Sequence, residues 1–173
     1  MKRKIFMLSS AIFLAVSFSG AVCTGKEEAM KIKSSVFEHN QYLPKKYTCH
    51  GEGVNPPLDI EGIPSGAKSL ALIVDDPDAP RGTYVHWVVF DIPLPGRIGE
   101  NSVPGKLGTN TSGATDYVSP CPPSGVHRYF YKVYALDTLL NLSDSGITKG
   151  QLEKAMAAHI LDKAEIVGLV EGR

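Results

Sequence analysis

Apolar and polar residues alternate along several short stretches of this chain, and Pro- and Gly-rich turns separate the stretches. Residues 127–136 (HRYFYKVYAL) alternate regularly, and the face that carries His127 is aromatic or aliphatic at every later position. Residues 69–74 (SLALIV) are apolar on both faces, which predicts a central strand covered on both sides. Residues 84–92 (YVHWVVFDI) are rich in β-branched and aromatic side chains. Several short strands separated by turns are typical of a β sandwich or barrel.

One segment near the C-terminus has a helical pattern instead. Thr148 is placed to cap the helix, and Gln151 follows three residues later, as in a capping box. A last strand is predicted over residues 165–170. The apolar stripe expected on the helix consists of Leu152, Met156, Ala157 and Ile160.

The first residues of the chain predict a signal peptide. Lys2, Arg3 and Lys4 precede an apolar run from Ile5 to Val22, and small side chains at residues 19–21 fit a signal-peptidase site. We therefore expect a signal peptide at residues 1–21, a linker at 22–30 and one domain at 31–173.

The predicted leader places the domain outside the cytoplasm, in the periplasm or secreted. Two alternatives stay open for the N-terminal segment. One is an uncleaved membrane anchor, because 18 apolar residues just reach spanning length. The other is a lipid anchor attached through Cys23.

Composition fits a globular domain and argues against a nucleic-acid partner. The chain has 173 residues, 43% of them hydrophobic and 21% charged. The formal net charge is +0, but removing residues 1–21 leaves 15 basic and 18 acidic residues, a net charge of −3. Nucleic-acid binding requires a basic surface, and the mature sequence has no basic cluster.

Two cysteines, Cys49 and Cys121, lie within the predicted domain. An oxidising compartment permits a disulfide between them. The sequence leaves open whether they form this bridge or are two small buried thiols. Both adjoin loops in which Pro and Gly gather, so we expect them to be close in space.

The candidate chemistry lies where strands meet these loops. Asp76 continues one face of the 69–74 strand, so it is expected to point into the fold, where a carboxylate needs a partner. His86 is expected to share its strand face with Tyr84, Val88 and Phe90. A single His in a strand is more often a core residue than a functional one. Here, however, both His86 and His127 lie in aromatic strands beside proline-rich loops.

Three ordered blocks of the sequence carry a resemblance to a known family. They are residues 47–58, which include YTCHGE and NPPL; the VDDPDAP and HWVV motifs; and the long block YVSPCPPSGVHRYFYKVYALD. The chain from about Ile32 to its end resembles the phosphatidylethanolamine-binding protein family, in its bacterial Raf kinase inhibitor-like branch. The resemblance implies a mostly β fold, with two antiparallel sheets in a sandwich and a helix near the C-terminus.

The resemblance also implies a shallow pocket that accepts a small oxyanion or a phospholipid headgroup, with no cofactor. Imidazole and phenol groups can donate to anionic oxygens, and a carboxylate can orient an imidazole. Arg128 is expected to form a structural ion pair with a loop aspartate. Two positions depart from the family pattern: Val85 replaces a histidine, and Ser119 replaces a glycine. By motif position, the pocket residues are Asp76, His86, Tyr117, Pro122, His127 and Tyr129.

We therefore expect a non-enzymatic binding protein. The family name suggests a kinase or a protease as a regulated protein partner, and the sequence leaves homodimerisation open. The alternative is a hydrolase that uses the same pocket. One form of this hydrolase would bind a metal through a facial triad of His86, His127 and Asp76, but the resemblance implies an anion there, and we expect no metal. Another form would use a catalytic triad of Ser119, His127 and an aspartate.

Overall fold

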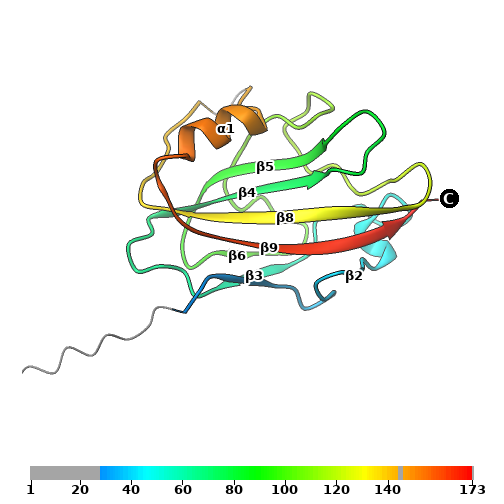
Figure 1. Cartoon of the computed structure of the whole chain (residues 1–173), viewed down its shortest axis with the longest axis horizontal. Helices are drawn as coiled ribbons and strands as arrows, with labels where there is room; N and C mark the ends of the chain where they lie inside the picture. Colours follow the sequence, from blue (N-terminus) through cyan, green and yellow to red (C-terminus); the bar gives the residue numbers. More distant parts are fainter. Residues whose placement is uncertain (1–27, 144–145, 173) are drawn as a thin grey trace, which may run out of the picture.

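The computed structural model describes residues 28–143 and 146–172, which fold into two β-sheets with one α-helix (Figure 1). The smaller sheet has the strand order β1-β3-β6, and the larger has the order β2-β9-β8-β4-β5-β7. This is the mostly β fold, with a helix near the C-terminus, that the sequence predicts. The strands are β1 (Lys31–Lys33), β2 (Gln41–Tyr42), β3 (Leu58–Glu61), β4 (Ser69–Asp76), β5 (Tyr84–Ile92), β6 (Arg97–Ile98), β7 (Lys106–Leu107), β8 (Val126–Leu136) and β9 (Ile160–Glu171); the helices are η1 (Lys45–Tyr47) and α1 (Lys149–Met156).

Adjacent strands are antiparallel except at one edge of the larger sheet. There β2 runs parallel to β9, with Gln41 opposite Gly168 and Tyr42 opposite Leu169. The predicted fold with two antiparallel sheets is confirmed, and this edge is its exception among the described strands. The β2 strand is only two residues long, so this parallel pairing is a short addition to an antiparallel sheet.

The larger sheet separates two apolar layers. Every residue of β4 is buried, as the doubly apolar run at 69–74 predicts. Leu70, Leu72 and Val74 face the smaller sheet, whereas Ala71 and Ile73 pack on the side covered by α1. The strand needs apolar side chains on both faces because both are covered.

Strand β8 shows the alternation that its sequence predicts. His127, Tyr129, Tyr131 and Val133 are buried on the inner face, while Arg128 is exposed on the other. This register is fixed by pairing with β4 on one side and β9 on the other. The inner face of β8 therefore brings a histidine and a tyrosine to the end of the sheet where the loops cluster.

The predicted helix cap is confirmed, but the predicted helix length and the start of the last strand are wrong. Thr148 accepts from the Gln151 N–H, and the Gln151 side chain accepts from the Thr148 N–H. The helix ends at Met156, so only Leu152 and Met156 of the expected stripe are buried. The chain then enters β9 at Ile160, five residues earlier than predicted.

A β-bulge shifts the faces of β5 beside His86. Val74 pairs with Trp87 and Asp75 pairs with Val85, so His86 is an extra residue on β5. A bulge of this kind lets consecutive residues point to the same side of a sheet. His86 and Trp87 accordingly both face inward. His86 shares its face with Tyr84, as expected, but the expected sharing with Val88 and Phe90 is wrong. Those two side chains pack instead in the layer under α1.

The N-terminal predictions lie mostly outside the described residues. The signal peptide at 1–21 and the lipid anchor at Cys23 belong to that part of the chain. Met30, placed by the sequence in the linker, is buried, and its N–H donates to Asp162. Among the residues that the structure describes, no helix is long and apolar enough to cross a membrane.

Candidate functional site

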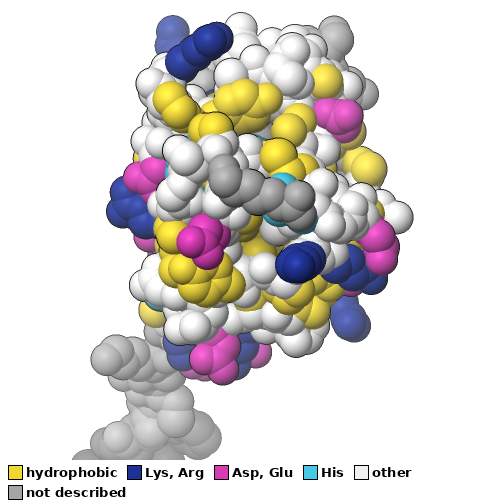
Figure 2. Space-filling model, turned by 90° about the vertical axis from the view of Figure 1, so that its right-hand side faces the viewer, with side chains coloured by type: hydrophobic (Ala, Val, Ile, Leu, Met, Phe, Trp, Pro, Cys, Tyr) yellow, Lys and Arg dark blue, Asp and Glu magenta, His cyan; other side chains and the backbone are white. Residues whose placement is uncertain are grey.

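A pocket with a volume of about 260 Å³ opens at the end of the larger sheet, where β4 ends and β5 and β8 begin. Figure 2 faces this end of the molecule and shows histidine atoms near its centre, with charged groups of both signs scattered around them. We call this pocket of about 260 Å³ the histidine pocket. It is lined by Asp76, Ala79, Pro80, Tyr84, His86, Val118, Ser119, Cys121, Pro122, Pro123, His127 and Tyr129.

Asp76 and His127 form a buried pair at the base of the histidine pocket. The His127 Nδ1 lies 2.7 Å from the Asp76 Oδ2, and the two residues are only 7% and 3% exposed. Because the carboxylate accepts, the Nδ1 carries the proton. The other carboxylate oxygen accepts from the Asp78 N–H at 2.8 Å. Asp76 thus has the buried partner that the sequence requires, and it fixes the imidazole in one orientation.

His86 is oriented in a similar way by a backbone carbonyl. Its Nδ1 lies 2.7 Å from the Val118 oxygen, and since a carbonyl only accepts, the Nδ1 must donate. The Val118 N–H in turn donates to the His86 carbonyl oxygen, which ties β5 to the pocket loop. Burial lowers the pKa of His86 below its usual value of 6.5, although the Val118 carbonyl and the Asp76 carboxylate oppose this shift.

Two tyrosine rings flank the His86 imidazole. The Tyr129 ring meets it edge-on at 5.1 Å, and the Tyr84 ring lies 4.8 Å away on a tilted plane. Burial, then the Asp76 carboxylate, raises the pKa of Tyr129 well above its usual value, so its hydroxyl keeps its proton. Tyr84 is absent from the predicted site residues. Its position two residues before His86 on the same strand face was the signal that could have found it.

The structure brings together five of the six predicted site residues and separates the sixth. Tyr117 does not line the histidine pocket. Its ring packs edge-on against Trp87 at 5.3 Å, and its hydroxyl lies 3.2 Å from that of Tyr131. Burial raises the pKa of Tyr117 well above its usual value. The Tyr117 side chain thus packs inside the protein, while the backbone of its neighbour Val118 bonds to β5.

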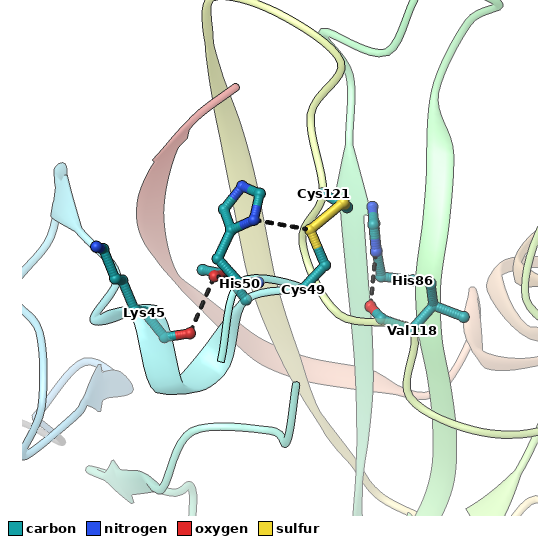
Figure 3. Close-up of a disulfide and its surroundings, with 7 residues drawn as sticks. Lys45, Cys49, His50, His86, Val118 and Cys121 are labelled. Carbon is teal, nitrogen blue, oxygen red and sulfur yellow. Dashed lines mark hydrogen bonds between the residues drawn. A yellow bond between two sulfur atoms is a disulfide. The ribbon is translucent and has the colours of Figure 1, made fainter. Parts of the chain in front are cut away.

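A disulfide closes one side of the histidine pocket. Cys49 and Cys121 are joined with a Cα–Cα distance of 5.3 Å, and Figure 3 shows the bridge beside His86. The Cys49 N–H also donates to the Pro120 oxygen at 3.0 Å. Both cysteines are exposed, so they are not the buried thiols of the alternative interpretation. The bridge fastens the Pro-rich loop, including the predicted residue Pro122, to the segment after η1.

The two departures from the family pattern have different positions. Val85 faces away from the histidine pocket and packs against the layer under α1, so it leaves the pocket wall unchanged. Ser119 does line the pocket. Its Oγ lies only 3.2 Å from the point that a Cβ on Gly53 would occupy, so the Ser119 side chain rests against the Gly53 backbone. The serine therefore adds a side chain to the rim.

The loop between β4 and β5 is held by the ion pair that the sequence predicts for Arg128. The Asp78 carboxylate accepts from the Arg128 backbone N–H at 3.0 Å, from Nε at 2.9 Å and from an Nη at 2.7 Å. These bonds lower the pKa of Asp78 to about 2. Arg128 thus holds the loop between β4 and β5 in place through Asp78, but it does not line the histidine pocket.

The Asp78 carboxylate should stabilise the fold down to strongly acidic pH. Because its pKa is lowered on folding, its contribution is present above about pH 4 and is lost as the pH falls through about 2. Asp78→Asn should therefore be less stable than wild type at neutral pH, and the two should converge below pH 2. Urea unfolding of both proteins across this range tests the prediction, and equal stability at pH 6 would contradict it.

The geometry bears on the two hydrolase alternatives. Within residues 28–143 and 146–172, no group of three or more His, Cys, Asp or Glu side chains is arranged to hold a metal ion. Asp76 and the two histidines share a pocket, but the Nδ1 of each imidazole already bonds to a protein oxygen. Likewise, no hydrogen bond joins Ser119 to His86 or His127 among the described residues.

What the pocket offers is two imidazole Nε2 atoms. Both Nδ1 positions are occupied by bonds to protein oxygens, so Nε2 is the remaining polar atom of each ring. When neutral, such a nitrogen accepts from an ammonium or from a protonated phosphate oxygen. When protonated, it donates to an anionic oxygen with added charge.

Comparisons with known proteins agree with this architecture. The family profile described as "Phosphatidylethanolamine-binding protein" matches residues 33–171. A UPF0098 protein of Pyrococcus horikoshii is 46% identical, and the alignment covers 95% of this chain and 87% of the relative. A UPF0098 protein of Chlamydia muridarum is 44% identical over 82% of this chain and 99% of the relative.

Solved structures show the same fold. The crystal structure of a phosphatidylethanolamine-binding protein homologue from Chlamydia trachomatis is 40% identical, with a TM-score of 0.80, over 84% of this chain and 99% of that chain. The E. coli protein YbcL, described as a member of the mammalian PEBP family, is 27% identical with a TM-score of 0.77, over 84% of this chain and 100% of that chain.

Proposed function

The chain belongs to the phosphatidylethanolamine-binding protein family, and we propose that its histidine pocket binds a small oxyanion, such as the phosphate of a phospholipid headgroup. The observation that carries this proposal is the arrangement of His86 and His127. Both imidazoles are anchored through Nδ1, which leaves Nε2 of each for a ligand in a pocket of about 260 Å³. This volume suits a headgroup and not a folded protein segment.

Binding of an anion in this pocket takes up a proton. A neutral His86 with its proton on Nδ1 presents only a lone pair at Nε2, which repels an anionic oxygen. The His86 ring binds an oxyanion favourably only when its Nε2 carries a proton. Because burial lowers the pKa of His86, the free protein is mostly neutral at this ring at pH 7, and the ligand must raise that pKa to bind.

Affinity for an oxyanion should therefore rise as the pH falls. Sulfate is the suitable probe, because its own charge is constant between pH 5 and 8. With one proton taken up on binding, affinity should increase by roughly tenfold per pH unit and level off once His86 is protonated in the free protein. The measurement is isothermal titration of sulfate into the protein at a series of pH values.

His86→Gln supplies the matched comparison, because glutamine is polar and does not titrate. This variant should bind sulfate more weakly at pH 5.5 and lose most of the pH dependence. His159→Gln is the control, since His159 bonds to Asp137 outside the pocket. If wild type and His86→Gln show the same pH profile, the proposal is wrong for this residue.

We extend the proposal to a non-enzymatic role outside the cytoplasm. The support for export is the sequence of residues 1–21, together with a disulfide of the kind that persists in oxidising compartments. The support for binding without catalysis is that Ser119 has no imidazole partner among the described residues. If the protein regulates a kinase or a protease, the mouth of the histidine pocket would lie at the interface with that partner. Mass spectrometry of proteins captured by this chain with and without sulfate would test this regulatory role.

A further inference from the structure

The Cys49–Cys121 disulfide lies at the surface, beside the histidine pocket. Both cysteines are exposed, and Cys121 lines the pocket whereas Cys49 does not. Exposed disulfides are the ones that exchange readily with thiols, because a thiolate must reach one of the two sulfur atoms. A thiol held in the histidine pocket would therefore approach the bridge from the side of Cys121.

The other sulfur atom of the bridge has an imidazole beside it. The His50 Nδ1 lies 3.9 Å from the Cys49 Sγ, and a dashed line in Figure 3 marks this contact. His50 does not line the histidine pocket. An imidazole that carries its proton on Nδ1 can donate to a thiolate, which makes Cys49 a better leaving group. The bridge is therefore asymmetric, with Cys121 at the pocket and Cys49 beside a proton donor.

The pocket also distinguishes thiols by their charge. His86, His127 and Cys121 line one pocket of about 260 Å³, which is small enough to bring a carboxylate and a sulfur of the same small molecule to these groups together. The surface as a whole has the opposite preference. Beyond residue 21 the chain has 15 basic and 18 acidic residues, a net charge of −3, which repels an anionic thiol. A preference for anionic thiols would thus be specific to the pocket.

We propose that the histidine pocket directs small thiol carboxylates to Cys121 and that the bridge is a site of thiol–disulfide exchange. The proposal rests on the oxyanion function proposed above and adds a covalent reaction and a class of reactant. The carboxylate binds at the imidazoles, and the thiolate of the same molecule attacks the Cys121 Sγ.

The exchange step conserves atoms and electrons. A bond forms between the incoming sulfur and the Cys121 Sγ while the bond between the two cysteine sulfurs breaks. The electron pair of the broken bond leaves with the Cys49 sulfur, and the resulting thiolate takes a proton from His50 or from water. One disulfide replaces another, so no oxidant or reductant is required. The product is a mixed disulfide on Cys121 and a free thiol on Cys49.

The test measures how fast two thiols open the bridge in the mature chain with Cys23→Ser, so that only Cys49 and Cys121 react. 3-Mercaptopropionate is the anionic probe and 2-mercaptoethanol is the neutral probe, compared at equal thiolate concentration and pH 6.5. The ratio of their rates is also measured in the urea-unfolded chain, which accounts for intrinsic reactivity. Folding should raise the ratio of anionic to neutral rates roughly tenfold, the effect of one charge-assisted hydrogen bond. An equal ratio in both states would overturn the proposal.

A histidine variant connects this advantage to the pocket. His86→Gln should remove most of the anionic advantage, and saturating sulfate should lower the ratio in the same way by occupying the imidazoles. His159→Gln is the matched control and should keep the full advantage, since His159 bonds to Asp137 outside the pocket. An advantage that survives both His86→Gln and sulfate does not come from the histidine pocket and would contradict the proposal.

The position of the adduct tests the direction of attack. After quenching with a maleimide, peptide mass analysis should find 3-mercaptopropionate on Cys121 and the maleimide on Cys49. The reverse distribution would contradict attack from the pocket. His50→Gln should slow both probes by a similar factor, because His50 acts on the leaving sulfur. Unchanged rates in this variant would show that His50 does not assist the step.

The failures of the two proposals are distinguishable. If sulfate binds with the expected pH dependence and folding leaves the ratio of thiol rates unchanged, the exchange proposal fails and the oxyanion function stands. If sulfate does not bind at any pH between 5 and 8 and the ratio is also unchanged, the proposed function itself fails, and the exchange proposal fails with it.

Discussion

Asp76→Ala should lower the free energy of unfolding by about 2–6 kcal/mol, because it leaves two donors unpaired and each unpaired buried donor costs about 1–3 kcal/mol. The substitution leaves the buried His127 Nδ1 without its acceptor, and it removes the oxygen that receives the Asp78 N–H. Both losses fall at the turn that leaves β4. Oxyanion binding should be lost as well, because the imidazole is no longer held in one orientation.

Asp76→Asn keeps the size of the side chain but removes the negative charge of the carboxylate, so it separates the effects of size and charge. The amide oxygen can still accept one of these hydrogen bonds, so we expect a smaller loss of stability than with alanine, while sulfate binding is still weakened. Chemical denaturation at pH 7 is the measurement. Glu52→Ala is the control, because that carboxylate is exposed and makes only a 3.9 Å contact with Lys46. A cost for Asp76→Ala no larger than for Glu52→Ala would contradict the buried pair.

Opening the disulfide should have the second large effect. Cys49 and Cys121 are separated by 72 positions in the sequence, and closing a loop of that length restricts the unfolded chain. The chain-entropy relation gives a stabilisation of about 4 kcal/mol, reduced where the unfolded state retains structure. The double variant Cys49→Ser, Cys121→Ser should therefore unfold at a clearly lower denaturant concentration than the oxidised wild type.

The same variant should also bind oxyanions more weakly. Cys121 lines the histidine pocket, and apart from the bridge this loop is tied to the segment of Cys49 by the bond from the Cys49 N–H to the Pro120 oxygen. A Cys23→Ser variant serves as the control, since Cys23 belongs to the segment predicted to be a linker. Equal midpoints for oxidised wild type and the double variant would show that the bridge is absent or without effect.

Periodicity was sufficient to predict much of the fold. The alternation in β8, the doubly apolar β4 and the capping box of α1 are local patterns, and each depends only on residues close in the sequence. The end of α1 and the start of β9 were not predictable in this way. They depend on where the chain must turn back to pair with β8, which is a tertiary constraint.

The candidate site was predicted less completely, for two physical reasons. The bulge at His86 depends on how β5 pairs with β4, and strict alternation cannot reveal it, so the inward position of Trp87 was missed. The Tyr117 side chain was assigned to the pocket by motif position. The ring packs instead against Trp87, and the hydroxyl lies beside that of Tyr131, which are tertiary contacts that no sequence pattern shows.

The central claim is that an oxyanion is received by the Nε2 atoms of His86 and His127. Long-range ¹H–¹⁵N correlation NMR of the imidazoles tests it most directly, with His159 as an internal reference outside the pocket. In the free protein at pH 7, His86 should be neutral with its proton on Nδ1. On saturation with sulfate, the Nε2 signal of His86 should shift to that of a protonated nitrogen and the Nε2 signal of His127 should also move, while His159 stays unchanged. Unchanged pocket imidazole signals in saturating sulfate, across pH 5 to 8, would contradict the account.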